Sequence, residues 1–113
     1  MTDPKTLDEA FKLVEENLFQ LFLKKHHDYG KENILAIQEL GITFRLQEKI
    51  ARLKNLLANV IEPTNESIDE TVDDIATYAI ILKLYRKGWF QKLEVEKKKW
   101  VELNFFSKKN TCY

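Results

Sequence analysis

The scarcity of helix-breaking residues is the feature that most limits how this chain can fold. Three glycines and two prolines occur in 113 residues, and Leu, Lys, Glu, Ile and Ala dominate the composition. Most of these residue types have good helix propensity. Apolar side chains also recur at three- and four-residue steps, which is the period of an amphipathic helix. The sequence therefore predicts an all-α bundle of four to five helices in a single domain spanning residues 1–113.

Caps and breakers place the first expected elements. Asp3-Pro4 is a typical helix start, so we expect a first helix from there to about Lys25, closed by Gly30. Residues 31–41 are expected to form a short helix or a packed loop, which Gly41 ends. The apolar face of the first helix consists of Leu7, Phe11, Val14, Leu18 and Leu21 or Phe22.

Two longer helices are expected next. One covers residues 44–60 and the other about 65–87, and between them Pro63 lacks the amide hydrogen that a continuous helix needs. Gly88 ends the later helix, and an extra C-terminal helix from about Gln91 to Leu103 precedes a short tail that ends at residue 113. The expected inner positions are Leu46, Ile50, Leu53, Leu57 and Val60 in the earlier helix and Ile68, Val72, Ile75, Ala79 and Leu82 in the later one.

The charge balance and the single cysteine exclude several classes of function. Eighteen basic and eighteen acidic residues give a formal net charge of zero, so no overall field attracts nucleic acid, and none is expected as a partner. Cys112 stands alone, which excludes an intrachain disulfide and a cysteine-based metal site. The N-terminal residues lack a signal-peptide pattern, and no apolar run is long enough to span a bilayer. We therefore expect a cytoplasmic protein that does not enter membranes.

An acidic segment at the start of the helix expected over 65–87 is the most informative functional feature. Five acids fall within nine residues: Glu66, Asp69, Glu70, Asp73 and Asp74. Glu66, Glu70 and Asp74 lie on one stripe, about 40° apart from each to the next. Because like charges repel, a divalent cation is the obvious partner. The alternative is a solvated face whose acids favour a helix N-terminus, which suits Asp73 and Asp74 less well than the other three.

The helix expected over 44–60 carries a matching set of polar residues. Glu48, Arg52 and Asn55 share one side at four- and three-residue spacing. The plain interpretation is a surface pair between Glu48 and Arg52, worth roughly a few tenths of a kcal/mol. The functional interpretation is that Glu48 joins the acids of the later helix around one or two Mg²⁺ ions, while Arg45, Lys49 or Arg52 contacts phosphate. Basic residues interleaved with acids suit a metal–phosphate substrate better than a bare metal store.

A third polar cluster occupies residues 25–31. The adjacent His26 and His27 cannot both face one metal on a helix, so a zinc site is not expected, and a helix C-terminus that favours protonated histidine explains them more simply. Tyr29 and Lys31 combine an aromatic ring with a cation, a pair suited to stacking a base and contacting a phosphate.

Three ordered blocks within about residues 20–85 together resemble a known family. They are Lys25-x-x-Asp28-Tyr29-Gly30, then Arg45-Leu46-x-Glu48-Lys49-x-x-Arg52-Leu53-x-Asn55-Leu56, then Glu66-Ser67-Ile68-x-Glu70-Thr71-x-x-Asp74-Ile75-Ala76-x-Tyr78-Ala79. The chain resembles the nucleotide modification associated family, a MazG-like branch of the all-alpha nucleoside triphosphate pyrophosphatase superfamily that is frequent in phages. The resemblance implies a MazG-like helical bundle that forms dimers or tetramers. It also implies Mg²⁺-dependent hydrolysis of a (deoxy)nucleoside triphosphate to the monophosphate and pyrophosphate, in nucleotide-pool or modified-base metabolism.

The resemblance implies roles for individual residues. Glu48, Glu70 and Asp74 would be catalytic, and the metal ligands would come from Glu48, Glu66, Glu70, Asp73 and Asp74. Substrate contacts would come from Tyr29, Lys31, Arg45, Lys49, Arg52 and Asn55. The superfamily pattern Glu-x-x-Asp fits Glu70 and Asp73, so Asp73 competes with Asp74 as a ligand.

One departure from the superfamily pattern keeps other functions open. The superfamily has Glu-x-x-Glu on its second helix, whereas Ala51 stands three residues after Glu48 here. A missing carboxylate is compatible with a non-catalytic protein that binds and sequesters a nucleotide or a cyclic nucleotide. A helical interaction protein whose acids are merely solvated is the third possibility.

Overall fold

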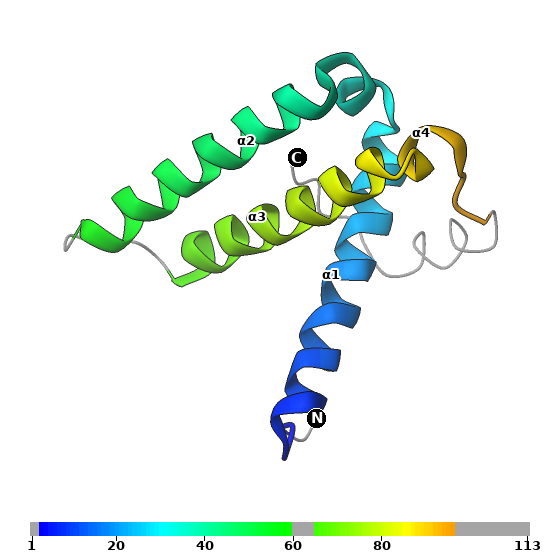
Figure 1. The fold of residues 1–113 in the computed structure, drawn as a ribbon. Coiled ribbons are helices and arrows are strands. Elements are labelled where there is room, and N and C mark those ends of the chain that lie inside the picture. The colour runs from blue at the N-terminus through cyan, green and yellow to red at the C-terminus, as the bar shows by residue number, and fades with distance from the viewer. Residues whose placement is uncertain (1–2, 60–64, 97–113) are drawn as a thin grey trace. The chain divides into compact units, whose positions relative to one another are not determined.

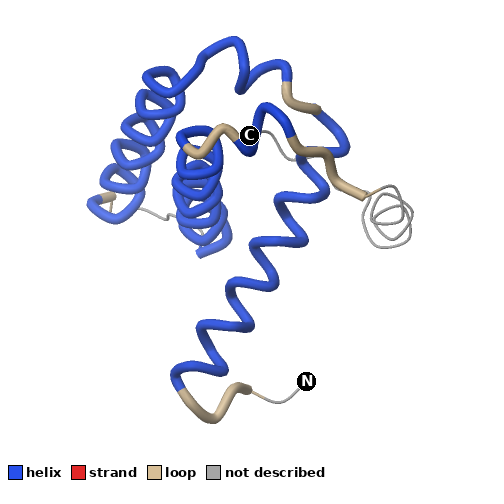
Figure 2. Tube along the Cα trace, turned by 45° about the vertical axis from the view of Figure 1, so that its right-hand side comes forward, coloured by secondary structure: helices blue, strands red, loops and turns tan. Residues whose placement is uncertain are grey.

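The computed structural model describes residues 3–59 and 65–96, and all regular structure in these ranges is helical (Figures 1 and 2). The helices are α1 (Leu7–Tyr29), α2 (Glu32–Ala58), α3 (Asn65–Arg86) and α4 (Trp89–Lys92). The all-α class predicted from the sequence is confirmed. None of these helices is long and apolar enough to cross a membrane within the described ranges.

The described residues divide into two compact units. Residues 3–28 of the N-terminal region group with residues 95–96, and Tyr29–Glu94 form the other unit. In this second unit α2 and α3 pack along each other, and α4 contacts α3 (Figure 1). The candidate site lies entirely within this unit.

Two glycines end helices where the sequence predicted. α1 stops at Tyr29 before Gly30, whose φ is 70°, and α3 stops at Arg86 shortly before Gly88, whose φ is 76°. Both values lie in the left-handed region, which glycine enters without a steric penalty. α1 therefore runs four residues beyond its expected end at Lys25.

The start of α1 differs from the prediction. Thr6 Oγ1 accepts a hydrogen bond from the Glu9 amide at 3.3 Å, and Glu9 Oε2 accepts one from the Lys5 amide at 2.9 Å. These reciprocal bonds resemble a capping box, which satisfies amides that a helix N-terminus leaves without partners. α1 consequently begins at Leu7, and Asp3-Pro4 lies outside it. Its apolar face is largely exposed at this end, with Leu7 at 85% and Phe11 at 72%.

α2 passes through Gly41, so the predicted break at this residue is wrong. The interruption lies at Gln38, where φ is 59° and ψ is −169°. A residue other than glycine in such a conformation costs about 1–3 kcal/mol. Gly41 has a different role, because a Cβ atom there would overlap the Cβ atom of Ile37. Residues 31–41 and the helix expected over 44–60 thus merge into one kinked helix.

The buried face of α3 differs from the apolar stripe predicted for it. Thr71, Tyr78 and Ile81 are buried, with Tyr78 only 1% exposed, whereas the predicted inner residue Val72 is 45% exposed and Ala79 is exposed. The other predicted inner residues, Ile68, Ile75 and Leu82, are half-buried. The most buried face is therefore displaced by about one residue, or 100°, from the predicted stripe and includes hydroxyl groups. The prediction failed because it followed the apolar residues alone.

The predicted inner face of α2 agrees with the structure only in part, at Leu46 and Leu53. Ile42 is fully buried, and Leu46 and Leu53 are half-buried, while the predicted inner residues Ile50 and Leu57 are exposed. Val60, the last of the predicted inner residues, lies outside the described residues. Polar positions on α2 consequently face α3.

α4 is much shorter than the C-terminal helix predicted over Gln91–Leu103. It ends at Lys92, and Leu93 has an extended backbone with φ −100° and ψ 148°. Gln91 and Lys92 are therefore helical as predicted, and the prediction is wrong for residues 93–96. Residues 97–103 lie outside the described part of the chain, so the prediction stays untested there.

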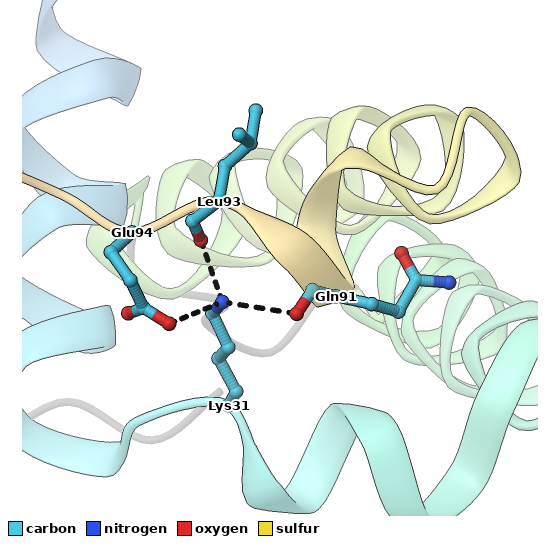
Figure 3. A network of polar contacts seen from close by, with 4 residues as sticks. All are labelled: Lys31, Gln91, Leu93 and Glu94. Atoms are coloured by element: carbon cyan, nitrogen blue, oxygen red, sulfur yellow. Dashed lines mark hydrogen bonds and ion pairs between the residues drawn. The ribbon is translucent and has the colours of Figure 1, made fainter.

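The ammonium group of Lys31 holds the end of α4 (Figure 3). Lys31 Nζ donates hydrogen bonds to the carbonyl oxygen of Leu93 at 2.6 Å, to Glu94 Oε1 at 2.9 Å and to the carbonyl oxygen of Gln91 at 3.5 Å. A cation is favourable here because carbonyl groups at a helix C-terminus carry partial negative charge. Lys31 thereby ties the beginning of α2 to the segment that follows α3.

Candidate functional site

A row of three cations on α2 forms the centre of the candidate site. Arg45, Lys49 and Arg52 follow one another at four- and three-residue steps, so they share one face of the helix. Arg45 and Lys49 are half-buried and Arg52 is exposed. The row faces α3 and not open solvent alone, as the following contacts show.

Each cation meets a polar side chain of α3, in antiparallel order. The pairs are Arg45 with Tyr78, Lys49 with Asp74 and Arg52 with Thr71. Each step toward the C-terminus of α2 therefore moves the partner residue about one turn toward the N-terminus of α3. The sequence analysis had identified the three cations and Asp74, but it assigned no role to Thr71 or Tyr78.

The middle pair is a partly buried ion pair. Lys49 Nζ lies 2.9 Å from Asp74 Oδ2, and the side chains are 25% and 12% exposed, respectively. Limited contact with water strengthens the attraction between these charges relative to a pair on an open surface. Asp74 is thus bound to a cation supplied by the neighbouring helix.

Tyr78 places a protonated phenol at one end of the row. Burial raises the pKa of Tyr78 above its ordinary value of 10.0. The positive charge of Arg45 acts in the opposite direction, and the negative charges of Asp74 and Glu48 raise the pKa further. The hydroxyl group is therefore neutral at neutral pH. Because the same pKa responds to Arg45, Glu48 and Asp74, these three charges lie within electrostatic range of one hydroxyl group.

Thr71 fixes the other end of the row. Its Oγ1 donates a hydrogen bond to the Ser67 carbonyl oxygen at 2.7 Å and accepts one from Arg52 Nε at 3.3 Å. A buried threonine that bonds to the preceding helical turn has little rotational freedom. It therefore offers the guanidinium group of Arg52 a fixed acceptor.

The predicted carboxylates are distributed unevenly around this interface. Asp74 faces α2, Asp73 is half-buried, and Glu48 and Glu70 are exposed. The side chain of Glu66 lies outside the described residues. Among the side chains that the structure describes, no three from His, Cys, Asp and Glu gather in a way that could hold a metal ion.

The donor atoms at the interface nevertheless suit Mg²⁺ that arrives with phosphate. Mg²⁺ is usually held by one or two carboxylates, with substrate phosphates and water completing its octahedron. Glu48 and Asp74 both act on the Tyr78 hydroxyl group, and Asp74 already accepts a cation in the form of the Lys49 ammonium group. Asp74, with Glu48 in electrostatic range of the same hydroxyl group, therefore supplies the carboxylate oxygen type that Mg²⁺ accepts.

The remaining predicted substrate residues take no part in the contacts described above between the row and α3. Asn55 and Tyr29 are exposed. The three N–H groups of Lys31 match three acceptors near α4, and its side chain is 11% exposed. A contact from Lys31 to substrate would consequently require the end of α4 to open.

Thr71 and Tyr78 are the site residues that the sequence analysis missed. They stand three residues before and four residues after Asp74, so a helical face drawn through Asp74 includes both. That spacing was the available signal, and the apolar stripe obscured it.

Comparisons of this chain with protein-family models, curated proteins and solved structures found no match. The chemistry of the site therefore has to be argued from its own residues. Arg52 stands seven residues after Arg45, which corresponds to about 10 Å along the helix. Cations spread over that length, with carboxylates beside them, suit a chain of phosphate groups and an accompanying divalent cation.

Proposed function

We propose that this protein is a Mg²⁺-dependent nucleoside triphosphate pyrophosphohydrolase that acts on (deoxy)nucleotides, in nucleotide-pool or modified-base metabolism of a phage and hence in the host cytoplasm. The observation that carries the proposal is the row of Arg45, Lys49 and Arg52 along α2, with Asp74 and Glu48 beside it. The resemblance of the three sequence blocks to the MazG-like family supports the same activity.

In this proposal the cation row binds the triphosphate. Arg45 and Arg52 present planar guanidinium groups, which can donate two parallel hydrogen bonds to phosphate oxygens, and Lys49 supplies a point charge between them. The hydroxyl group of Thr71 positions the guanidinium group of Arg52 through a hydrogen bond, and Arg45 lies within electrostatic range of the Tyr78 hydroxyl group. The α2 face thus orients the phosphates before any bond breaks.

The carboxylates bind the metal and accept a proton in this proposal. Asp74 and Glu48, joined by Glu70 from the exposed side of α3, would hold the metal, and Asp73 competes with Asp74 for this role. Bound Mg²⁺ supplies a more acidic water and neutralises phosphate charge. A carboxylate that does not contact the metal accepts the proton from the attacking water. Arg52 and Lys49 stabilise the negative charge on the departing pyrophosphate.

The same site also supports a second candidate function, the sequestration of a nucleotide or cyclic nucleotide without hydrolysis. The Lys49–Asp74 ion pair favours this alternative, because the carboxylate is satisfied by a side chain. Ala51, which stands where the superfamily has a glutamate, removes one expected ligand. A homo-oligomer, either a dimer or a tetramer, belongs to both versions, since exposed Leu7 and Phe11 offer apolar surface for association.

The decisive experiment compares pyrophosphate release from a panel of nucleoside triphosphates in the presence of Mg²⁺. We expect Glu70→Gln to lower turnover by more than roughly 100-fold, the upper range for changes outside the metal's direct ligands. Asp69→Asn is the matched control, because Asp69 is an equally exposed acid one residue earlier on α3 and should leave turnover unchanged.

Circular dichroism and thermal unfolding of both variants provide the control for folding, and we expect both to match the wild type. Full turnover in Glu70→Gln and in Asp74→Asn would refute the ligand assignment. A wild-type protein that releases no pyrophosphate, but whose melting temperature rises with nucleotide concentration, would establish the sequestering function instead.

A further inference from the structure

We propose that Lys49 and Asp74 form an exchangeable ion pair, which makes Mg²⁺ and the triphosphate bind to this protein together. The inference rests on the proposed function and concerns how the same site takes up its ligands. In the ligand-free state each side chain is the counter-ion of the other. When ligands bind, Lys49 turns to a phosphate oxygen and Asp74 turns to Mg²⁺.

The burial of the pair makes separate binding unfavourable. The Nζ–Oδ2 distance is 2.9 Å, and the Lys49 and Asp74 side chains are 25% and 12% exposed. A partly buried charge that loses its partner is destabilised, because its limited contact with water does not compensate for the lost interaction. Mg²⁺ alone would take Asp74 and leave Lys49 unpaired, whereas a triphosphate alone would take Lys49 and leave Asp74 close to added negative charge. Joint binding gives both side chains a new partner.

The neighbouring pairs assign this coupling to Lys49 in particular. Arg52 donates a hydrogen bond to the neutral hydroxyl group of Thr71, and Arg45 lies within electrostatic range of the neutral hydroxyl group of Tyr78. These two guanidinium groups can therefore contact phosphate without separating an ion pair. Among the ion pairs found in residues 3–59 and 65–96, the Lys49–Asp74 pair is the one that lies in this row, so binding at Lys49 requires an exchange of charged partners.

The arrangement makes opposite predictions for two isosteric variants. Lys49→Met removes the internal cation and keeps the aliphatic stem, so the metal alone should bind Asp74 more tightly. Asp74→Asn removes the internal anion, so the triphosphate alone should bind Lys49 more tightly. In both variants the cooperation between the two ligands should disappear. The double variant Lys49→Met/Asp74→Asn contains no unpaired charge at this position, so it provides a folded reference if a single variant unfolds.

Calorimetry with the full chain tests these predictions. A non-hydrolysable nucleoside triphosphate analogue is titrated in EDTA and again in excess Mg²⁺, and Mn²⁺ alone is titrated as the metal probe. For the wild type we expect the Kd of the analogue to be lower with Mg²⁺ by about tenfold or more, within the usual range of coupling between two ligands.

The variants should change this pattern in opposite ways. Asp74→Asn should lower the Kd of the analogue in EDTA by about the same factor, so that the ratio of its Kd in EDTA to its Kd with Mg²⁺ comes close to one. Lys49→Met should lower the Kd for Mn²⁺ and weaken analogue binding in EDTA. The double variant should show a ratio near one, and the control Lys54→Met, an exposed lysine on α2, should behave as wild type.

The outcomes separate this inference from the proposed function. If the wild type binds the analogue with Mg²⁺ but Asp74→Asn does not tighten binding in EDTA, or if Lys49→Met binds Mn²⁺ no better than wild type, the exchange is refuted and the nucleotide site stands. A double variant that keeps the wild-type ratio of Kd values would refute the exchange as well. A wild type that binds the analogue under neither condition would refute the proposed function and the exchange together.

Discussion

A methyl group at position 41 should destabilise the protein, even though alanine is a better helix former than glycine. Helix propensity alone predicts that Gly41→Ala stabilises α2 by about 1 kcal/mol. The new Cβ atom would, however, overlap the Cβ atom of Ile37 and lie 3.0 Å from its Cγ1 atom. The Cβ atom of Ile37 is attached to the backbone and cannot rotate away, and overpacking of this kind costs about 1–3 kcal/mol. The expected result is a net loss of about 1 kcal/mol, obtained as the difference between these two effects.

Urea unfolding followed by circular dichroism measures this difference. Ala51→Gly provides the propensity scale within the same helix, because Ala51 is exposed, and it should cost about 1 kcal/mol. Gln38→Gly completes the series. At a positive φ it should stabilise the protein by about 1 kcal/mol, since relief of strain exceeds the entropic cost of glycine. A stabilising Gly41→Ala together with a destabilising Gln38→Gly would mean that α2 is straight, and the kink would be refuted.

Further predictions concern the buried phenol and the Lys31 contacts. Because burial raises the pKa of Tyr78 above 10.0, its contribution to stability is complete below pH 10.0 and is lost as the pH rises through the folded-state value, since the unfolded chain ionises first. Urea unfolding at increasing alkaline pH should therefore show a steeper loss of stability for wild type than for Tyr78→Phe, and parallel curves would contradict this. Lys31→Met should lower the free energy of unfolding by about 1–3 kcal/mol and accelerate amide exchange around α4, because it removes the hydrogen bonds that the charged Lys31 ammonium group donates. The control Lys54→Met should have neither effect.

The sequence predicted the helices well where a glycine ends them. α1 and α3 end near Gly30 and Gly88 because these two glycines adopt the left-handed region, in which a helix cannot continue. This requirement depends on a single residue, so it can be recognised in the sequence. Gly41 carries the same residue type without this requirement. Its role depends on the position of Ile37 in a kinked helix, which no local pattern encodes.

The candidate site was only half visible for a similar reason. Arg45, Lys49, Arg52 and Asp74 could be identified because charges at helical spacing stand out in a sequence. Their partners Thr71 and Tyr78 could not, because the apolar period of α3 indicates a face one residue away from the face that packs on α2. Tertiary packing of polar groups overrode the hydrophobic pattern here, and periodicity measures only the latter.

The turn-by-turn pairing along α2 and α3 restricts how this site can change in evolution or by design. Inserting one residue between Arg45 and Lys49 would swing the later cations about 100° away from their partners, whereas seven inserted residues in each helix would restore the phase almost completely. The two helices can therefore be lengthened only together, in matched steps of two turns.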